Sequence, residues 1–130
     1  MPSREVESKL KKEPVVWLVT ASKDRRPQAV PVWFLWDGKS FLIYAQPGTK
    51  VRHIRANPQV QVHLNTDESG NEVVRASGHA TIAKSQPPAY KVPAYVRKYR
   101  SDLKGFGWTP EEFSRRYPFP IRVSRLKFHS

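Results

Sequence analysis

The sequence predicts a mainly β protein with helices, built as a small barrel of about six antiparallel strands in one domain, residues 1–130. Apolar side chains recur with period two in several short stretches before residue 83 and again at the end of the chain. Between these stretches, residues 89–117 change to a period of about 3.6, which indicates helices. A chain of 130 residues is long enough for one core without disulfide or metal cross-links.

The chain is expected to begin with a helix and a strand. In residues 3–12, Val6 and Leu10 lie four apart among charged side chains, which is the spacing of a short amphipathic helix, and Pro14 ends it. Residues 15–20 form an unbroken run of apolar and β-branched side chains. This run predicts a strand that is buried on both faces.

A second strand and a hairpin follow. Residues 28–36 are apolar on both faces, and Pro31 removes one backbone donor, so the strand is expected to be irregular there or to have an N–H edge that faces something other than a neighbouring strand. A planar ligand against that interrupted edge is one possible consequence. Asp37 and Gly38 predict a tight hairpin turn, and residues 39–44 return as the antiparallel partner.

Residues 43–58 read as a strand, a turn at Gln46-Pro47-Gly48 and a short helix with Thr49 as N-cap. Lys50 in the first turn costs about 0.3–1 kcal/mol, because the helix dipole already makes that end positive. A phosphate there would accept hydrogen bonds from the Thr49 hydroxyl, backbone N–H groups and the Lys50 ammonium. The alternative is a solvated surface helix with a lysine at its start.

Two more strands are expected after this helix. Residues 59–65 alternate apolar and polar side chains, with His63 on the polar face. Residues 68–71 supply a turn, and residues 73–82 form a fifth strand. Gly78 within that strand indicates a bulge or a close approach of another part of the chain.

The C-terminal third predicts two helices and a closing strand. Val92, Val96, Tyr99 and Leu103 mark one face of the first helix, and a capping box at residues 109–112 opens the second. The apolar phase slips within residues 120–128, which predicts a bulge near Ser124 and Arg125.

The formal net charge of +12 predicts attraction to polyanions, but the basic residues are dispersed and carry no nucleic-acid motif. With no cysteine, disulfides and thiolate metal sites are excluded. The N-terminus is polar and charged, and no apolar run approaches the roughly 18–20 residues of a membrane span. We therefore expect a soluble cytoplasmic protein that does not bind membranes.

The motifs that carry a family resemblance are Val32-Trp33-Phe34-Leu35-Trp36-Asp37-Gly38, Gly48-Thr49-Lys50-Val51-Arg52 and Ile54-Arg55-Ala56-Asn57-Pro58. Together they resemble the pyridoxamine 5'-phosphate oxidase-like (PPOX class) split-barrel superfamily. Within it, the sequence is most similar to the branch of flavin- or deazaflavin-dependent (coenzyme F-420) oxidoreductases. The resemblance covers almost the whole chain and implies a dimeric FMN-binding split β-barrel.

The resemblance also implies where a cofactor would bind. A homodimer would hold two molecules of FMN or of deazaflavin coenzyme F-420 at the subunit interface. The phosphate would lie at Thr49 and Lys50, and the ring would lie along the strand from Val30 to Trp33. The cofactor-binding residues expected on this basis are Val30, Pro31, Val32, Trp33, Tyr44, Gln46, Thr49, Lys50, Arg52, Arg55 and His63.

Several of these residues have a purely structural alternative. Residues 31–33 could serve ordinary core packing. Arg52 and Arg55 would reach further phosphate or a glutamate tail, or remain solvated helix charges. His63 would face the ring pocket across the interface, or be a satisfied surface histidine.

The sequence also departs from true pyridoxamine phosphate oxidases. Their second strand carries an arginine that holds the cofactor phosphate, whereas residues 28–30 here have none, which argues against oxidation of pyridoxamine phosphate. The chain shows no paired carboxylates or Ser-His-Asp set, and its four histidines lack metal-ligand spacing. No metal site and no dedicated general base are expected, and catalytic residues cannot be named.

Three functions remain open from the sequence. The first is an oxidoreductase that uses a bound flavin or deazaflavin for hydride transfer to or from a small substrate. The second is a non-catalytic protein that binds or sequesters such a cofactor. The third, less expected, is a basic barrel that binds nucleic acid.

Overall fold

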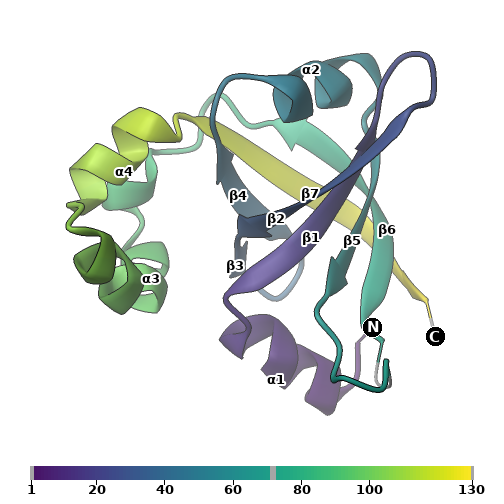
Figure 1. Cartoon of the computed structure of the whole chain (residues 1–130), viewed down its shortest axis with the longest axis horizontal. Coiled ribbons are helices and arrows are strands. Elements are labelled where there is room, and N and C mark those ends of the chain that lie inside the picture. Colours follow the sequence, from purple (N-terminus) through teal and green to yellow (C-terminus); the bar gives the residue numbers. More distant parts are fainter. Residues whose placement is uncertain (1, 71–72, 130) are drawn as a thin grey trace.

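The computed structural model describes residues 2–70 and 73–129, and one curled antiparallel sheet organises them (Figure 1). Its strands are β1 (Val15–Ala21), β2 (Pro27–Trp33), β3 (Leu35–Trp36), β4 (Phe41–Ala45), β5 (Gln59–Leu64), β6 (Arg75–Ile82) and β7 (Phe119–His129). The helical segments are α1 (Arg4–Lys12), α2 (Thr49–Ala56), the 3-10 helix η1 (Ala89–Lys91), α3 (Pro93–Phe106) and α4 (Pro110–Arg116). The prediction of a mainly β fold with helices is confirmed.

The sheet has the strand order β2-β1-β5-β6-β7-β4-β3, so its two edges are β2 and β3. These two strands are consecutive in the chain, and Phe34 alone separates them. The chain therefore crosses from one edge of the curled sheet to the other at Phe34, and the half-barrel is split there.

The predicted second strand, residues 28–36, is thus two strands, and the total within the described residues is seven rather than six. The break lies at Phe34 rather than at Pro31, so the expected irregularity is wrong, whereas the alternative, an N–H edge without a neighbouring strand, agrees with the place of β2 at one end of the strand order. Pro31 stays in the ladder opposite Trp17. An edge strand needs backbone donors on one side only, which is why proline is tolerated in β2.

β4 is buried at every position because apolar clusters lie on both of its faces. Inside the curl, Phe41, Ile43 and Ala45 join the main core. On the other face, Leu42 and Tyr44 pack against a second cluster contributed by α3 and α4. These helices form a separate layer beside β4, outside the half-barrel (Figure 1).

β1 is buried on one face only, which corrects the prediction of burial on both. Val16 and Leu18 are inside the core, whereas Val15, Trp17 and Val19 are half-buried on the outer face of the sheet. An antiparallel sheet can leave one face to solvent or to another subunit. The apolar run therefore reflects an outer surface as well as a core.

The predicted starts of two helices and the predicted hairpin turn are confirmed. The Val6 N–H donates to the Ser3 hydroxyl (3.3 Å) at the start of α1. Asp37 accepts hydrogen bonds from the N–H groups of Lys39 (2.9 Å) and Ser40 (2.7 Å) in the hairpin turn. In the capping box, the Glu112 N–H donates to the Thr109 hydroxyl (3.1 Å).

The bulge predicted near Ser124 and Arg125 is also confirmed. The register between β6 and β7 shifts between Ser77 and His79, and Arg125 has a φ of 52°. A Cβ on Gly78 would lie 2.8 Å from a Val123 methyl carbon, so the close approach expected at this glycine is present. The predicted turn at residues 68–71 lies partly outside the described residues, since Asn71 is not among them.

Two helix predictions need correction. The N-cap of α2 is Gly48, whose φ of 149° favours glycine, and Thr49 is the first helical residue. On α3, Tyr95 is buried together with Tyr99 and Leu103, whereas the predicted Val92 and Val96 are only half-buried. Over the described ranges, no helix has the length and apolar character needed to cross a bilayer.

Candidate functional site

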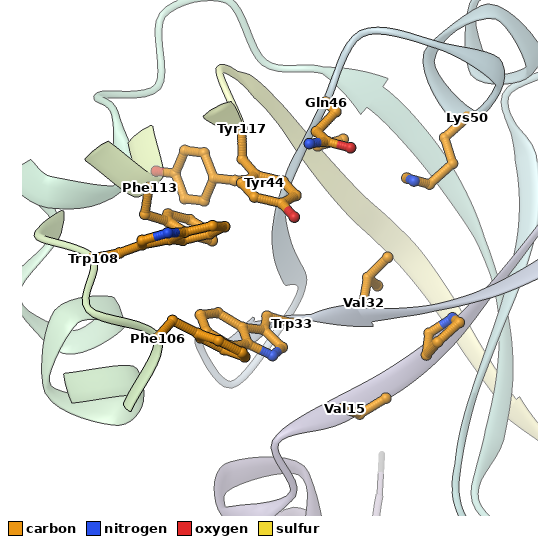
Figure 2. A pocket seen from close by; sticks show the side chains of 12 residues that line it. Val15, Val32, Trp33, Tyr44, Gln46, Lys50, Phe106, Trp108, Phe113 and Tyr117 are labelled. Carbon is orange, nitrogen blue, oxygen red and sulfur yellow. The ribbon is translucent and has the colours of Figure 1, made fainter. Parts of the chain in front are cut away.

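A cavity of about 520 Å³ lies at the split of the half-barrel, between β2, β4 and the start of α2. This volume is within the roughly 300–1,000 Å³ that small-molecule sites occupy. Its lining residues are Val15, Pro31, Val32, Trp33, Tyr44, Ala45, Gln46, Lys50, Phe106, Trp108, Phe113 and Tyr117. Figure 2 shows Lys50 on one side, aromatic rings on the other and Val32 between them.

Lys50 makes one end of the cavity basic. Its side chain extends from the first turn of α2 toward the cavity (Figure 2), and it is half-buried. Burial lowers the pKa of Lys50, because removal of water disfavours the charged amine. Within residues 2–70 and 73–129, no carboxylate pairs with this amine. A desolvated cation beside the positive end of a helix therefore lacks an anion.

Tyr44 lies between the cavity and the helical layer. Its hydroxyl donates to the Pro87 carbonyl (2.6 Å), and burial raises the pKa of this phenol. Arg122 extends the contact: it donates to Gln86 Oε1 (2.9 Å) and forms an ion pair with Asp37 (2.9 Å). These bonds join the β3–β4 turn, β7 and the loop before η1, and so fix the wall that carries Tyr44.

Six of the eleven predicted cofactor residues line this cavity: Pro31, Val32, Trp33, Tyr44, Gln46 and Lys50. They come from β2, from β4 and from the turn into α2. β2 and this turn are apart in the sequence, and the curl of the sheet brings them close together in space. The geometry thus assembles the part of the predicted set that would contact both a phosphate and a ring.

The other five predicted residues are not in the lining, and three of them belong to α2. Thr49 accepts a hydrogen bond from Arg52 Nη2 (3.0 Å), and an accepting hydroxyl can still donate its own O–H. Arg52 and Arg55 are exposed, and the Arg55 guanidinium lies 5.6 Å from the centre of the Phe119 ring. Both arginines lie outside the cavity of this single chain.

Val30 and His63 lie on the sheet away from the cavity. Val30 is half-buried in β2 opposite Leu18. The His63 ring is parallel to Trp17 within 9°, with 6.1 Å between the ring centres, on the outer face of β5 and β1. His63 therefore faces outward from the half-barrel.

The aromatic end of the cavity was not predicted. Phe106 is the last residue of α3, Trp108 follows its C-cap Gly107, and Phe113 and Tyr117 belong to α4 and its C-cap. The only available signal was the density of aromatic residues between 106 and 117. Their spacing indicates helix packing equally well, so the sequence could not assign them to a site.

Trp33 connects this aromatic end to the helical layer. Its ring stacks on Tyr99 with 4.3 Å between ring centres and an angle of 4°, and it lies 5.4 Å from Phe113. The Tyr99 hydroxyl donates to the Pro14 carbonyl (2.7 Å) and accepts from the Phe34 N–H (2.7 Å). α3 therefore supplies the hydrogen-bond partner for the Phe34 N–H at the strand break. This contact also orients the neighbouring Trp33.

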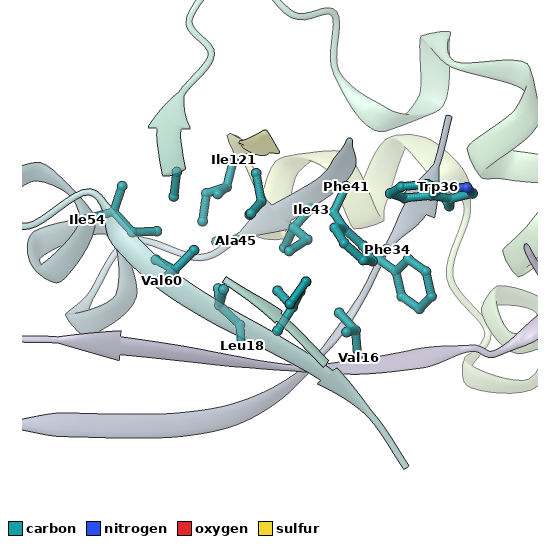
Figure 3. Packing of buried hydrophobic residues seen from close by; sticks show 14 of the residues in the cluster. Val16, Leu18, Phe34, Trp36, Phe41, Ile43, Ala45, Ile54, Val60 and Ile121 are labelled. Atoms are coloured by element: carbon teal, nitrogen blue, oxygen red, sulfur yellow. The ribbon is translucent and has the colours of Figure 1, made fainter. Parts of the chain in front are cut away.

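Lys98 binds the other backbone group at the strand break, the Phe34 carbonyl. Its Nζ donates to the Phe34 carbonyl (2.8 Å) and lies 3.7 Å from the centre of the Phe34 ring, which points into the core (Figure 3). Burial lowers the pKa of Lys98 from 10.5 to about 8, although the carboxylate of Glu13 opposes the shift. The Lys98 amine thus loses its proton more easily in the folded chain than in the unfolded chain.

This shift predicts a pH dependence of stability. Between pH 8 and pH 10.5 the unfolded chain holds a proton on Lys98 that the folded chain has released, so stability rises with pH. Urea unfolding at a series of pH values should show wild type gaining stability relative to Lys98→Met across this window. A difference between the two proteins that stays constant from pH 7 to pH 10.5 would show that Lys98 is not linked to folding.

A family model described as pyridoxamine 5'-phosphate oxidase matches residues 2–129. The chain belongs to this family. No curated protein matches the chain. Among solved structures, it is similar to an F420 reductase, with 22% identity over 99% of this chain and 98% of the other and a TM-score of 0.73.

Two further structures of the family fold carry other descriptions. A FAD-binding protein from Mesorhizobium loti is 17% identical over 98% of this chain and 92% of the other, with a TM-score of 0.61. The heme storage protein HutZ from Vibrio cholerae is 15% identical over 97% of this chain and 89% of the other, with a TM-score of 0.60. At these identities the likeness shows the fold alone, and it confirms the predicted split barrel.

In this member of the pyridoxamine 5'-phosphate oxidase family, the cavity fits a phosphate-bearing, ring-containing cofactor. The basic end has an amine without an anion, and the middle is apolar. Its lining holds neither a carboxylate nor a histidine, and the described residues contain no group of three side chains suited to a metal. The lining can therefore bind, orient and exclude water, but it supplies no carboxylate or imidazole for acid–base catalysis.

Proposed function

We propose that this chain is a flavin- or deazaflavin-binding oxidoreductase, with the cofactor phosphate at the N-terminus of α2 and the ring along β2. The observation that carries the proposal is Lys50: its amine is half-buried, its pKa is lowered and no carboxylate of the described chain pairs with it. Leaving such a cation unpaired is unfavourable. A bound phosphate would remove this penalty and would also use the free N–H groups of the first turn.

The rest of the cavity supports a ring beyond the phosphate. Pro31 and Val32 line it from the edge strand β2, whose outer edge pairs with no strand of the described residues. Backbone groups on a free edge can hydrogen-bond a flat heterocycle, and the apolar side chains exclude water from it. When bound, the cofactor would supply hydride transfer to or from a small substrate.

Both FMN and coenzyme F-420 remain candidates. The exposed Arg52 and Arg55 lie on the same short helix as Lys50 and would suit the anionic glutamate tail of the deazaflavin. The net charge of +12 also favours the more anionic of the two cofactors, F-420. We therefore favour F-420 slightly over FMN.

We further propose a homodimer in which the second copy covers the outer face of β1. Val15, Trp17 and Val19 are half-buried there, and Pro31 on β2 is exposed beside them. Val15 and Pro31 also line the cavity, so a partner on this face would help to enclose the cofactor. His63 would then lie at the interface, since its ring stacks on Trp17.

A second candidate function is non-catalytic binding or sequestration of the same cofactor. The absence of carboxylate and histidine side chains from the lining favours it, because such a site can hold a cofactor without assisting proton transfer. Turnover separates the two functions. If the reduced protein–cofactor complex is reoxidised by added small acceptors faster than free cofactor is, the chain is an enzyme.

The decisive experiment measures equilibrium binding of FMN and of F-420 to wild type and to Lys50→Ala. We expect wild type to bind one of them, and Lys50→Ala to bind it at least tenfold more weakly, a loss of about 1.4 kcal/mol. Lys39→Ala is the matched control, because Lys39 is exposed on the β3–β4 turn and lies outside the lining. Binding of neither cofactor, or equal binding by Lys50→Ala, would contradict the proposed site.

A further inference from the structure

Helix α3 carries three cations on its outer face, which we call the α3 stripe. Its members Arg97, Arg100 and Lys104 are exposed, whereas Tyr95 and Tyr99 on the same helix are buried. Residues three, four and seven apart share one face of an α-helix, so the cations lie together on the side away from the buried tyrosines. α3 and α4 stand apart from the half-barrel (Figure 1), and the outer side of α3 is therefore open to a partner.

The α3 stripe has no negative charge to balance it. Over residues 2–70 and 73–129, no ion pair joins Arg97, Arg100 or Lys104 to a carboxylate. Asp102 is the acid of α3, but it is two residues from Arg100 and from Lys104, and residues two apart do not face each other on a helix. Like charges three and four residues apart repel each other, so the stripe lowers the stability of α3.

α1 and α4 provide a comparison within the same chain. Both have acidic residues in the first turn and basic residues in the last turn, where the helix dipole stabilises each sign. α3 has no acid in its first turn, and Arg97 and Arg100 lie in its middle, where the dipole gives them no stabilisation. The charges of α1 and α4 are therefore explained by helix stability, and those of the α3 stripe are not.

The composition of the α3 stripe identifies the kind of partner. A helix that binds a membrane surface uses a large apolar face, but the apolar face of α3 is buried within the chain. A protein partner needs apolar or aromatic anchors at the centre of the contact, and single-stranded nucleic acid needs aromatic rings on which its bases stack. The stripe has neither, whereas the backbone of a duplex requires only cations. The stripe spans about 10 Å of the helix axis, a length in which a duplex carries about six phosphates.

We propose that the outer face of α3 binds the phosphate backbone of a nucleic-acid duplex, without reading its base sequence, through Arg97, Arg100 and Lys104. The net charge of +12 attracts the duplex from a distance, and the stripe supplies the place where it is held. The stripe lies outside the residues that line the cavity, so this binding does not depend on the proposed cofactor.

The test follows the fluorescence anisotropy of a labelled DNA duplex of about 20 base pairs at a series of salt concentrations. At about 0.1 M salt, we expect Arg97→Gln/Arg100→Gln/Lys104→Gln to bind about tenfold more weakly than wild type. The slope of log K against log salt should become less negative by about 2.7, because each lost phosphate contact removes about 0.9. Glutamine is a good helix former and the three sites are exposed, so the variant should keep the urea midpoint of wild type.

Lys23→Gln/Lys39→Gln/Lys127→Gln is the matched control. These lysines are also exposed, and the change removes the same amount of positive charge from the β1–β2 turn, the β3–β4 turn and β7. Exposed charges separated by more than about 10 Å are largely screened at 0.1 M salt, so this variant should weaken duplex binding less than about twofold.

Three results would overturn the duplex site on α3. The first is wild type that does not bind the duplex. The second is equal weakening by the two triple variants, which would show that binding follows net charge alone. The third is stripe-dependent binding to vesicles of phosphatidylcholine with about 30% phosphatidylglycerol that is tighter than binding to the duplex, which would make the partner a membrane. Failure of the proposed function is distinct, because it concerns cofactor binding and Lys50→Ala, and the stripe variant should bind the cofactor as wild type does.

Discussion

Tyr99→Ala is expected to lower the free energy of unfolding by about 4–5 kcal/mol, the largest effect of a single substitution considered for this chain. The Tyr99 side chain is completely buried and stacks on Trp33 at 4.3 Å. Its removal would leave a cavity between α3 and the split of the half-barrel. Because small domains are stable by only about 5–15 kcal/mol, this variant should be close to unfolding.

Tyr99→Phe removes the hydroxyl and keeps the ring, so it measures what the hydroxyl alone contributes to stability. Without the hydroxyl, the buried Phe34 N–H loses its partner at 2.7 Å, and the Pro14 carbonyl, which belongs to an exposed residue, loses a part-buried hydrogen bond. An unsatisfied buried group costs about 1–3 kcal/mol, and we expect a loss in this range because the Pro14 carbonyl can turn to water. The variant should fold and permit a full measurement.

Urea unfolding followed by tryptophan fluorescence and far-UV circular dichroism would measure both variants. Tyr90→Phe is the control, because it removes a hydroxyl from a tyrosine that is 40% exposed, and it should change stability by less than about 0.5 kcal/mol. If Tyr99→Phe is as stable as wild type, the hydrogen bonds at Phe34 do not hold the strand break. α3 would then be attached by apolar packing alone.

Gly78→Ala is expected to destabilise the protein by about 2–3 kcal/mol through overpacking. The new Cβ would lie 2.8 Å and 2.9 Å from side-chain carbons of Val123 and Leu126, and 3.1 Å from the Ser124 carbonyl oxygen. Val123 is completely buried, and Ser124 presents backbone, so neither can move freely. β7 would have to shift where its bulge meets β6.

Gly105→Ala is the matched control for this substitution. It makes the same chemical change within α3, where the Cβ would meet no atom within 4 Å. Alanine is favoured over glycine in a helix, so this variant should be more stable than wild type by up to about 1 kcal/mol. Opposite signs for the two variants in one urea series would establish the close approach at Gly78. Equal stability of Gly78→Ala and wild type would contradict it.

Local patterns in the sequence determined most of the elements and part of the site. Alternation identified β5 and β6, turn residues located the hairpin at Asp37, and the phase slip near Arg125 located the bulge. Lys50 could be predicted as an anion ligand because a cation in a first helical turn is locally unfavourable. Each of these inferences needs only residues that are neighbours in the chain.

Only the tertiary structure decided which features meet. At the split, the Phe34 N–H donates to Tyr99 and the Phe34 carbonyl accepts from Lys98; both partners lie far along the chain and have no local signature. In the same way, the curl of the sheet places Lys50 and Phe106 on one cavity, while Thr49 and His63 fall outside it. Periodicity reports which face of an element is apolar. What covers that face is determined by packing between distant segments.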